Sequence, residues 1–278
     1  MSQAYERIAF EVQDGVATLT FNNPAKRNAF DPAMRVEMAE VVERVATDAA
    51  IRSLVLTGAG PHFCSGGDLG NIAASGLDNA GWRQRLSSLH HWLKDLMLLD
   101  KPVVAAVDGA AYGAGFSLAL AADFIIASTR ARFAMSFIRV GVVPDCAAFY
   151  TLPRVVGVQR ARELMLSGRE VSAQEALQLG IATELVAPEA LPARAQAIAR
   201  SFVGASPVAL SLIKRSLALA ANDLPSLLEQ EANAQALAMG TAEHREAVQC
   251  FLDKRPAPFQ WPQDEDAGQR HTPPGVSG

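Results

Sequence analysis

One aspartate stands alone in an apolar stretch of the chain. In "GVVPDCAAFY" (141–150), Asp145 is the only charged residue. Taking a carboxylate out of water costs on the order of several kcal/mol unless it is paired or protonated. The Pro-Asp pair also favours a turn, which explains the local geometry but not the apolar neighbours. A carboxylate held in such surroundings has a raised pKa, and this suits it to give and take protons.

Two glycine-containing loops, each following an apolar strand, offer backbone amides for the same chemistry. They read "CSGGDL" (64–69) and "YGAGFS" (112–117), and the second runs into a helix. Glycine lets the backbone approach a ligand closely, and the first N–H groups of a helix lack intrahelical acceptors. Two such amides converging on one point would stabilise an oxyanion. Tight packing is the simpler explanation for either loop alone. Phosphate binding fits less well, because no GxGxxG order and no Gly-Lys-Ser/Thr is present.

Short apolar strands must position these loops. Alternating runs flank Asp14-Gly15 and predict a hairpin. The continuous apolar runs that follow are typical of strands buried on both faces, so we expect a layered α/β core. The predicted strands cover 7–13, 16–21, 53–58, 102–107 and 123–128.

Helices are predicted between the strands and dominate after residue 157. Asp31-Pro32 has the form of an N-cap followed by proline, opening a helix to about Thr47. A second helix is expected over 80–99, and Ser172 with Glu175 has capping-box spacing. We expect a core over 1–200, a helical region over 201–260 and a disordered tail over 261–278.

The composition argues against several classes of protein. Half of the 278 residues are hydrophobic and 19% are charged, which is enough for a large core. The net charge of −4 favours neither nucleic acid nor an anionic membrane as a partner. Three scattered cysteines without a CxxC or Cys/His cluster indicate no disulfide framework and no metal site. With no secretory signal evident, we expect a cytoplasmic protein.

Six segments, in order along the chain to about Phe259, resemble the enoyl-CoA hydratase/isomerase (crotonase) superfamily. They are "NNPAKRNAF" (22–30), "RSLVLTGAGPHFCSGGDL" (52–69), "KPVVAAVDGAAYGAGFSLALAADFIIAS" (101–128), "ARFAMSFIRVGVVPDCAAFYTLPRVVG" (131–157), "GREVSAQEALQLGIATELV" (168–186) and "FLDKRPAPF" (251–259). The resemblance implies a ClpP-like spiral of β-β-α turns with a C-terminal helical trimerisation region. It also implies an acyl-CoA thioester substrate, no cofactor beyond the substrate's CoA, and a homotrimer or dimer of trimers.

The resemblance assigns roles to individual residues. The amides of Gly67 and Ala114 would polarise the thioester carbonyl, and Lys254 with Phe259 would reach the CoA of a neighbouring subunit. The residues implied to contact CoA or the acyl group are Lys26, Arg27, Asn28, Ala29, Ser65, Gly66, Asp68, Leu69, Ser117, Phe137, Lys254 and Phe259.

The chain departs from the hydratases of this superfamily at two positions. Ser117 and Phe137 stand where those enzymes carry the two glutamates that activate water and deliver a proton. Asp145 instead lies where several isomerases place a single acid. The stretch "VPDCAAFYTLPRVVG" looks most like ring-epoxyphenylacetyl-CoA isomerases of phenylacetate breakdown, which also isomerise Δ3-enoyl-CoA to Δ2. Ala147, Ala148 and Phe149 are bulkier than usual there, so the acyl group can differ.

One carboxylate is sufficient for double-bond isomerisation. It would remove the C2 proton of a 3-enoyl thioester, while the two amides hold the enolate oxygen, and return the proton at C4. We expect Val142, Phe137 and Phe149 to supply the apolar surroundings of Asp145. The alternatives are a hydratase with another carboxylate, a 4-halobenzoyl-CoA dehalogenase, an RNA-binding relative and an inactive acyl-CoA binder. Phe137 in place of a tryptophan argues against the dehalogenase, and the acidic balance against RNA.

Other chemically capable side chains have simpler interpretations. We expect Asp68 to fix its loop as a hydrogen-bond acceptor and His62 to lie in a surface loop. His90 and His91 are predicted on a helix near the acyl pocket, one packed and one solvated. The remaining candidates are Cys64 and Cys146, interpreted as small buried hydrophobes, and Glu163 and Glu175, interpreted as solvated helix residues.

Overall fold

The strands form two sheets, one of seven strands and one of three, among the described residues. The computed structural model describes residues 5–219, 223–262 and 269–270. In spatial order the larger sheet contains β1 (Ile8–Gln13), β2 (Val16–Phe21), β3 (Ser53–Gly58), β4 (Val103–Val107), β6 (Phe124–Ser128), β9 (Glu184–Val186) and β10 (Gln269–Arg270). The smaller sheet contains β5 (Ala110–Tyr112), β7 (Arg132–Ala134) and β8 (Glu170–Ser172).

Each turn of the chain adds a strand to one sheet and then a strand or bridge to the other. β4 is followed by β5 and β6 by β7, while after β3 a parallel bridge joins Cys64 to Ala111. A further bridge joins Phe30, after β2, to Gly67. This is the expected spiral of β-β-α turns. It brings the segments that follow successive strands of the larger sheet next to one another.

The N-terminal elements form as their sequence predicts. β1 and β2 pair antiparallel around a turn in which Asp14 and Gly15 both have positive φ, at 51° and 81°. Asn/Asp-Gly tolerates this conformation, so the turn matches the twist of the strands. At the next helix, Asp31 accepts a hydrogen bond from the Met34 N–H at 2.9 Å, and Pro32 is the first helical residue.

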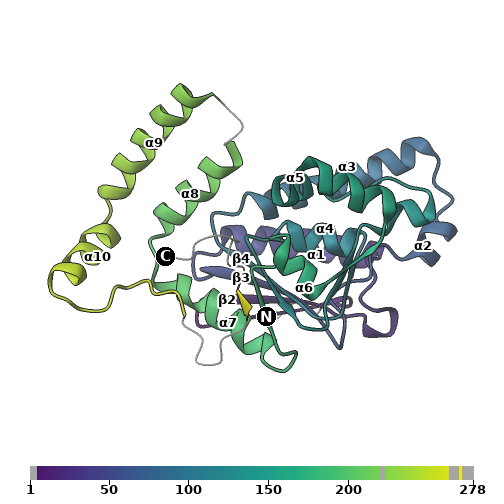
Figure 1. The fold of residues 1–278 in the computed structure, drawn as a ribbon, viewed down its shortest axis with the longest axis horizontal. Helices are drawn as coiled ribbons and strands as arrows, with labels where there is room; N and C mark the ends of the chain where they lie inside the picture. Colours follow the sequence, from purple (N-terminus) through teal and green to yellow (C-terminus); the bar gives the residue numbers. More distant parts are fainter. Residues whose placement is uncertain (1–4, 220–222, 263–268, 271–278) are drawn as a thin grey trace.

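Helices cover both faces of the larger sheet, as Figure 1 shows, so β4 is buried on both sides. Val103, Ala105 and Val107 face one core cluster, and Val104 and Ala106 face the other. α1, α3, α4 and α5 lie over the first face and α7 over the second. Their bounds are α1 (Pro32–Thr47), α2 (Leu69–Ala74), α3 (Asn79–Met97), α4 (Ala114–Leu120), α5 (Ala148–Ser167), α6 (Ala173–Gln178) and α7 (Leu191–Ser201). Three 3-10 turns complete this part, η1 (Pro24–Lys26), η2 (Ser136–Val140) and η3 (Phe202–Gly204).

The C-terminal helices stand away from this body. α8 (Pro207–Leu219), α9 (Leu224–Met239) and α10 (Ala242–Leu252) extend to one side in Figure 1. α9 has no buried residue among those described. No single helix in the described ranges is long and apolar enough to cross a membrane, and the bent pair 191–204 with 207–218 passes that test by length and composition only.

The expected disordered tail is wrong for its described residues. The Trp261 ring lies 5.4 Å from the Phe124 ring, centroid to centroid, and the Pro262 carbonyl accepts from Arg194 at 3.0 Å. Gln269–Arg270 pairs antiparallel with β9. Apolar contact and strand pairing therefore order residues that the composition alone predicts to be disordered. The rest of 263–278 lies outside the described residues.

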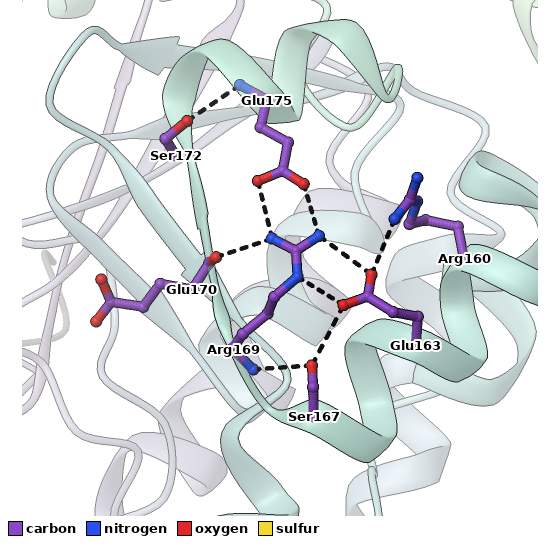
Figure 2. Close-up of polar contacts among 7 residues, drawn as sticks. All are labelled: Arg160, Glu163, Ser167, Arg169, Glu170, Ser172 and Glu175. Carbon is purple, nitrogen blue, oxygen red and sulfur yellow. Dashed lines mark hydrogen bonds and ion pairs between the residues drawn. The ribbon is translucent and has the colours of Figure 1, made fainter.

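A salt-bridge cluster fastens the edge of the smaller sheet (Figure 2). Arg169 donates from Nε to Glu163 at 2.6 Å and from Nη2 to Glu175 at 2.6 Å, so the expectation of two solvated glutamates is wrong. Ser172 accepts from the Glu175 N–H, but the Glu175 carboxylate turns to Arg169 instead of closing a capping box. The neighbouring Glu170 accepts from the Tyr112 hydroxyl at 2.7 Å, which links the cluster to β5.

Arg169→Met tests this fastening. We expect unfolding in urea to show a loss of roughly 1–2 kcal/mol, discounted for partial exposure, because Glu175 would lose its ion pair and Glu163 would keep only its contact with Arg160. The loss should shrink in high salt. Arg160→Met is the control, since Arg160 makes one 3.2 Å contact with Glu163. Equal losses in the two variants would contradict a special role for Arg169.

Candidate active site

The first glycine loop (64–69) lies beside β5 and extends the smaller sheet by one backbone bridge. The Cys64 N–H donates to the Ala110 carbonyl at 3.0 Å, and the Tyr112 N–H donates to the Cys64 carbonyl at 2.9 Å. On the other side, the Phe30 N–H donates to the Gly66 carbonyl at 2.7 Å. The first glycine loop is therefore held between two neighbours by backbone hydrogen bonds, directly beside the start of α4.

Glycine is required at this junction because backbone packs on backbone. A Cβ at Gly115 would lie 2.2 Å from the Cys64 carbonyl oxygen, and one at Gly66 would lie 2.8 Å from the Tyr112 oxygen. Gly113 has φ 52° and ψ −121°, which turns the chain from β5 into α4. Any larger residue would push the two loops apart.

The amides of Gly67 and Ala114 are left without acceptors. Ala114 is the first residue of α4, so its N–H has no intrahelical partner. The bridge to Phe30 uses the Gly66 carbonyl and the Asp68 N–H, and it leaves the Gly67 N–H aside. Within the described part of the chain, neither amide donates to a protein acceptor. Both residues line one cavity, so the arrangement expected of an oxyanion hole is present.

That cavity has a volume of about 750 Å³ and mostly apolar walls. α3 forms one wall, and the segment from η2 to the start of α5 forms another. Phe137, Val142 and Phe149, which we expected around Asp145, all line it. The charged or titratable side chains along its walls are Arg35, Arg85, His90, Arg139 and Asp145.

Asp145 lies in the wall of the same cavity as the two amides. Its Oδ1 is buried and has no hydrogen-bond partner. Burial raises the pKa of this carboxyl, although the Cys146 thiol donates to it and Arg35 and His90 attract its charged form. The desolvation effect exceeds these attractions, as expected for a carboxylate in an apolar site.

The backbone after Asp145 is strained. Cys146 and Ala147 have φ of 50° and 62°, which costs roughly 1–2 kcal/mol per non-glycine residue. Cys146 is fully buried in the core, and the Ala148 N–H bonds the Asp145 carbonyl at 3.1 Å to open α5. Core packing thus holds a conformation that the sequence disfavours, and it keeps Asp145 at the cavity wall.

The segment implied to bind CoA lies beside the first glycine loop. Lys26 donates to Asp68 at 2.7 Å, and the Ser65 N–H donates to the Arg27 carbonyl at 3.0 Å. Hydrogen bonds from Lys26 and from the Asn71 N–H lower the pKa of Asp68, which confirms its loop-fixing role. Ser65, Gly66 and Leu69 line the cavity, and Lys26 and Arg27 are exposed beside it.

Other residues implied by the resemblance have structural partners. The Asn28 amide donates to the Ala59 and His62 carbonyls, and Ala29 is buried. Ser117 is fully buried and its hydroxyl donates to the Gly113 carbonyl at 3.2 Å, so it lies behind the cavity wall instead of in it. Of α4, only Ala114 lines the cavity among the described residues, so this helix contributes its first N–H there but no polar side chain.

Lys254 and Phe259 lie in the C-terminal region, away from their own chain's cavity lining. Phe259 stacks on Phe202 with 5.5 Å between ring centroids, and Lys254 has φ 56°. Their implied contact with a neighbouring subunit stays a prediction.

The histidines differ from expectation. Both His90 and His91 are exposed, although one was expected to be packed. His91 bonds the Ser87 carbonyl of its own helix, whereas His90 lines the cavity. His62 is half-buried, and its Nδ1 accepts from the Ala110 N–H at 3.2 Å instead of facing solvent.

Sequence reasoning placed His90 near the acyl pocket but missed the other residues of the same α3 face, including Arg85. Its cavity-lining residues follow helical spacing and include Trp82, Arg85, Leu86, Leu89 and His90. This stripe at i, i+3, i+4, i+7 and i+8 was readable in the sequence as one helix face. No such spacing in the sequence indicated that Arg35 of α1 would line the cavity.

The cysteines carry no chemistry here. Burial raises the pKa of Cys64 to about 12 and that of Cys146 well above its usual range. A thiol that stays protonated is a poor nucleophile.

In the described ranges no group of three or more His, Cys, Asp or Glu residues is placed to hold a metal ion.

The chain matches one family model and several known proteins along most of its length. Residues 11–263 match the family model described as Enoyl-CoA hydratase/isomerase. The chain is 39% identical to 1,2-epoxyphenylacetyl-CoA isomerase of Escherichia coli K12, over 91% of this chain and 98% of that protein. It is 38% identical to a probable enoyl-CoA hydratase of Rhodobacter capsulatus, with 92% and 98% covered. A crystal structure of an enoyl-CoA hydratase/isomerase from Cupriavidus metallidurans CH34 superposes with a TM-score of 0.89 at 44% identity, covering 95% and 100%.

Asp145→Asn tests the burial of the carboxylate through stability. A raised folded-state pKa adds stability below the unfolded pKa of about 3.9 and removes it as pH rises through the folded value. We therefore expect Asp145→Asn to raise the melting temperature at neutral pH, with the gain vanishing near pH 4. Thermal melts across this range measure it. Asp95→Asn, an exposed site on α3, is the control; the same gain there, or none at Asp145, would contradict a desolvated Asp145.

Proposed function

Because this chain belongs to the enoyl-CoA hydratase/isomerase family, we propose that it is an acyl-CoA double-bond isomerase with Asp145 as its single acid/base. The observation that carries the proposal is the shared cavity: Asp145, Gly67 and Ala114 all line it, and Asp145 is its one carboxylate among the described residues. A relative named 1,2-epoxyphenylacetyl-CoA isomerase supports an isomerase acting on a CoA thioester, although its name gives an epoxide as the substrate.

The geometry suits a proton transfer through an enolate. With the thioester oxygen at the Gly67 and Ala114 amides, negative charge that develops on oxygen meets two donors already in place. Each such donor is typically worth about 10²–10³ in rate. The acidity of the C2 proton rises accordingly, and Asp145 takes that proton and returns it at C4.

The raised pKa of Asp145 serves both halves of this cycle. A carboxylate with a higher pKa is a stronger base toward C2, and the resulting acid still gives up its proton to C4. Oδ1 has no hydrogen-bond partner, so no such bond must break before this oxygen takes up the proton. No cofactor is needed, because the proton lost at one carbon is regained at another.

A hydratase is the second candidate, because His90 also lines the cavity. Hydration needs one group to activate water and one to protonate carbon, and Asp145 with His90 would form that pair. The relative from Rhodobacter capsulatus carries a hydratase name. Loss of the conjugated thioester absorbance of crotonyl-CoA, faster than isomerisation of a 3-enoyl-CoA, would favour this candidate.

Asp145→Asn tests the isomerase directly. We expect kcat on a 3-enoyl-CoA to fall about 10²–10⁴-fold, the usual worth of general acid–base catalysis, while binding of hexanoyl-CoA persists. In the parent enzyme kcat/KM should rise with pH through the raised pKa of Asp145, and the variant should lack that limb. Asp95→Asn serves as the activity control. Full isomerisation by Asp145→Asn would refute the assignment.

We propose that the protein assembles as a homotrimer or a dimer of trimers through its C-terminal helices. The support is the apolar surface that these helices leave exposed, where Phe251 has 82% of its area accessible. Exposed apolar patches of this kind mark association surfaces. The large exposed apolar residues there are Val208, Ile213, Leu217, Leu224, Leu228, Leu237, Met239, Val248, Phe251 and Leu252.

Light scattering after size exclusion tests the assembly. We expect a mass of three or six chains, and we expect the double variant Leu237→Glu, Phe251→Glu to shift toward smaller species because it places charges in an apolar contact. Val36→Glu, an exposed position on α1, is the control. A monomeric parent protein would overturn the proposal.

A further inference from the structure

Two guanidinium groups in the cavity wall have buried donors without acceptors. Arg35 comes from α1 and Arg85 from α3, and both line the cavity that holds Asp145. The Arg35 Nε and Arg85 Nη2 atoms are buried with no hydrogen-bond partner. Buried charged donors are nearly always satisfied in folded proteins, so two in one cavity require an explanation.

The surrounding protein balances these charges only in part, through the attraction of Asp145 and Asp31 for Arg35. In the described part of the chain their close contacts are with ring faces: the Arg35 Cζ lies 5.6 Å from the Phe30 centroid and the Arg85 Cζ 4.9 Å from the Trp82 centroid. No ion pair involves either side chain there. By contrast, buried Arg194 makes two hydrogen bonds to Glu184.

Asp145 does not satisfy Arg35 either. The two attract each other, yet Oδ1 of one and Nε of the other both stay without a hydrogen bond. Arg85 repels Arg35, and burial lowers the pKa of both guanidiniums. An acceptor brought from outside would relieve the repulsion and the lost hydrogen bonds together.

The charge of the cavity differs from that of the chain. Arg35, Arg85 and Arg139 line it against the single carboxylate of Asp145, whereas the whole chain has a net charge of −4. A cationic cavity in an acidic protein favours an anionic ligand. A carboxylate matches the planar fork of a guanidinium and can bridge two of them.

We propose that Arg35 and Arg85 bind a second carboxylate at the far end of the acyl chain, so that the preferred substrates are monothioesters of dicarboxylic acids. This rests on the acyl-CoA function proposed above. Asp145 acts at the acyl carbons and Arg35 faces Asp145, which puts the subsite on the acyl side of the thioester. The aromatic faces of Phe30 and Trp82 would pack along the chain that connects the two ends.

Binding of saturated, unreactive ligands tests the subsite without turnover. Hexanoyl-CoA and adipyl-CoA differ only by a terminal methyl against a terminal carboxylate, and titration calorimetry gives both Kd values. We expect the protein to bind adipyl-CoA on the order of 10- to 100-fold more tightly, as for charge-assisted hydrogen bonds. The pairs butyryl/succinyl and octanoyl/suberyl locate the chain length at which the preference is greatest.

Arg85→Met and Arg35→Met should each bring the ratio of the two Kd values toward one, and Arg85→Lys should keep part of it. Arg83→Met is the matched control, because Arg83 is exposed on the same helix and outside the cavity lining. Since neither guanidinium donates a hydrogen bond to the described residues, we expect melting temperatures at or above that of the parent. Lower melting temperatures with an unchanged ratio would assign the arginines to the fold and overturn the proposal.

Two further results would overturn it. Equal or tighter binding of hexanoyl-CoA by the parent protein removes the preference that the subsite explains. Weaker binding of free CoA in Arg35→Met and Arg85→Met, as large as the loss for adipyl-CoA, would show that the arginines bind the phosphates of CoA. The outcome is separate from the proposed reaction: full activity in Asp145→Asn with the preference intact refutes the mechanism alone.

Discussion

The contact of the Cys64 carbonyl with the backbone of α4 is the constraint on which the site depends. A Cβ at Gly115 would lie 2.2 Å from that oxygen, so the two chain segments meet with no side chain between them. The positions of both amides of the proposed oxyanion hole follow from this contact. Gly67 comes three residues after Cys64, and Ala114 precedes Gly115. A helix held this close presents its first N–H where the neighbouring loop presents its own.

The smaller sheet connects this contact to the salt-bridge cluster at its other edge. β5 leads into α4 and pairs with β7, which pairs with β8 at the edge. The cluster of Arg169 with Glu163 and Glu175 holds that edge, and Tyr112 bonds Glu170 across it. Burial and this hydrogen bond raise the pKa of Tyr112 to about 12, so the hydroxyl stays a donor. Polar contacts at this edge therefore help to hold β5, the strand that leads into α4.

The cavity combines apolar walls with a few unsatisfied polar groups. Asp145, Arg35 and Arg85 each contribute a buried atom without a partner. Such atoms destabilise the empty protein, and a substrate that supplies their partners would recover that free energy on binding. Polar atoms without partners would only destabilise a closed core. In a cavity, they indicate which hydrogen-bonding groups a ligand should carry. In this interpretation, the amides locate the thioester, Asp145 the reacting carbons and the arginines the far end.

The sequence by itself determined the family, five strands of the larger sheet, the two glycine loops and the isolated aspartate, but no strand of the smaller sheet. These features depend on local physics: strand periodicity, the conformations open to glycine and the cost of a lone charge among apolar residues. Only the tertiary structure decided which other side chains reach the cavity. Ser117 turned inward to Gly113, while Arg35, Arg85 and His90 arrived from two helices. The rotation of a helix against its neighbours sets which face it presents, and that depends on packing between residues far apart in sequence.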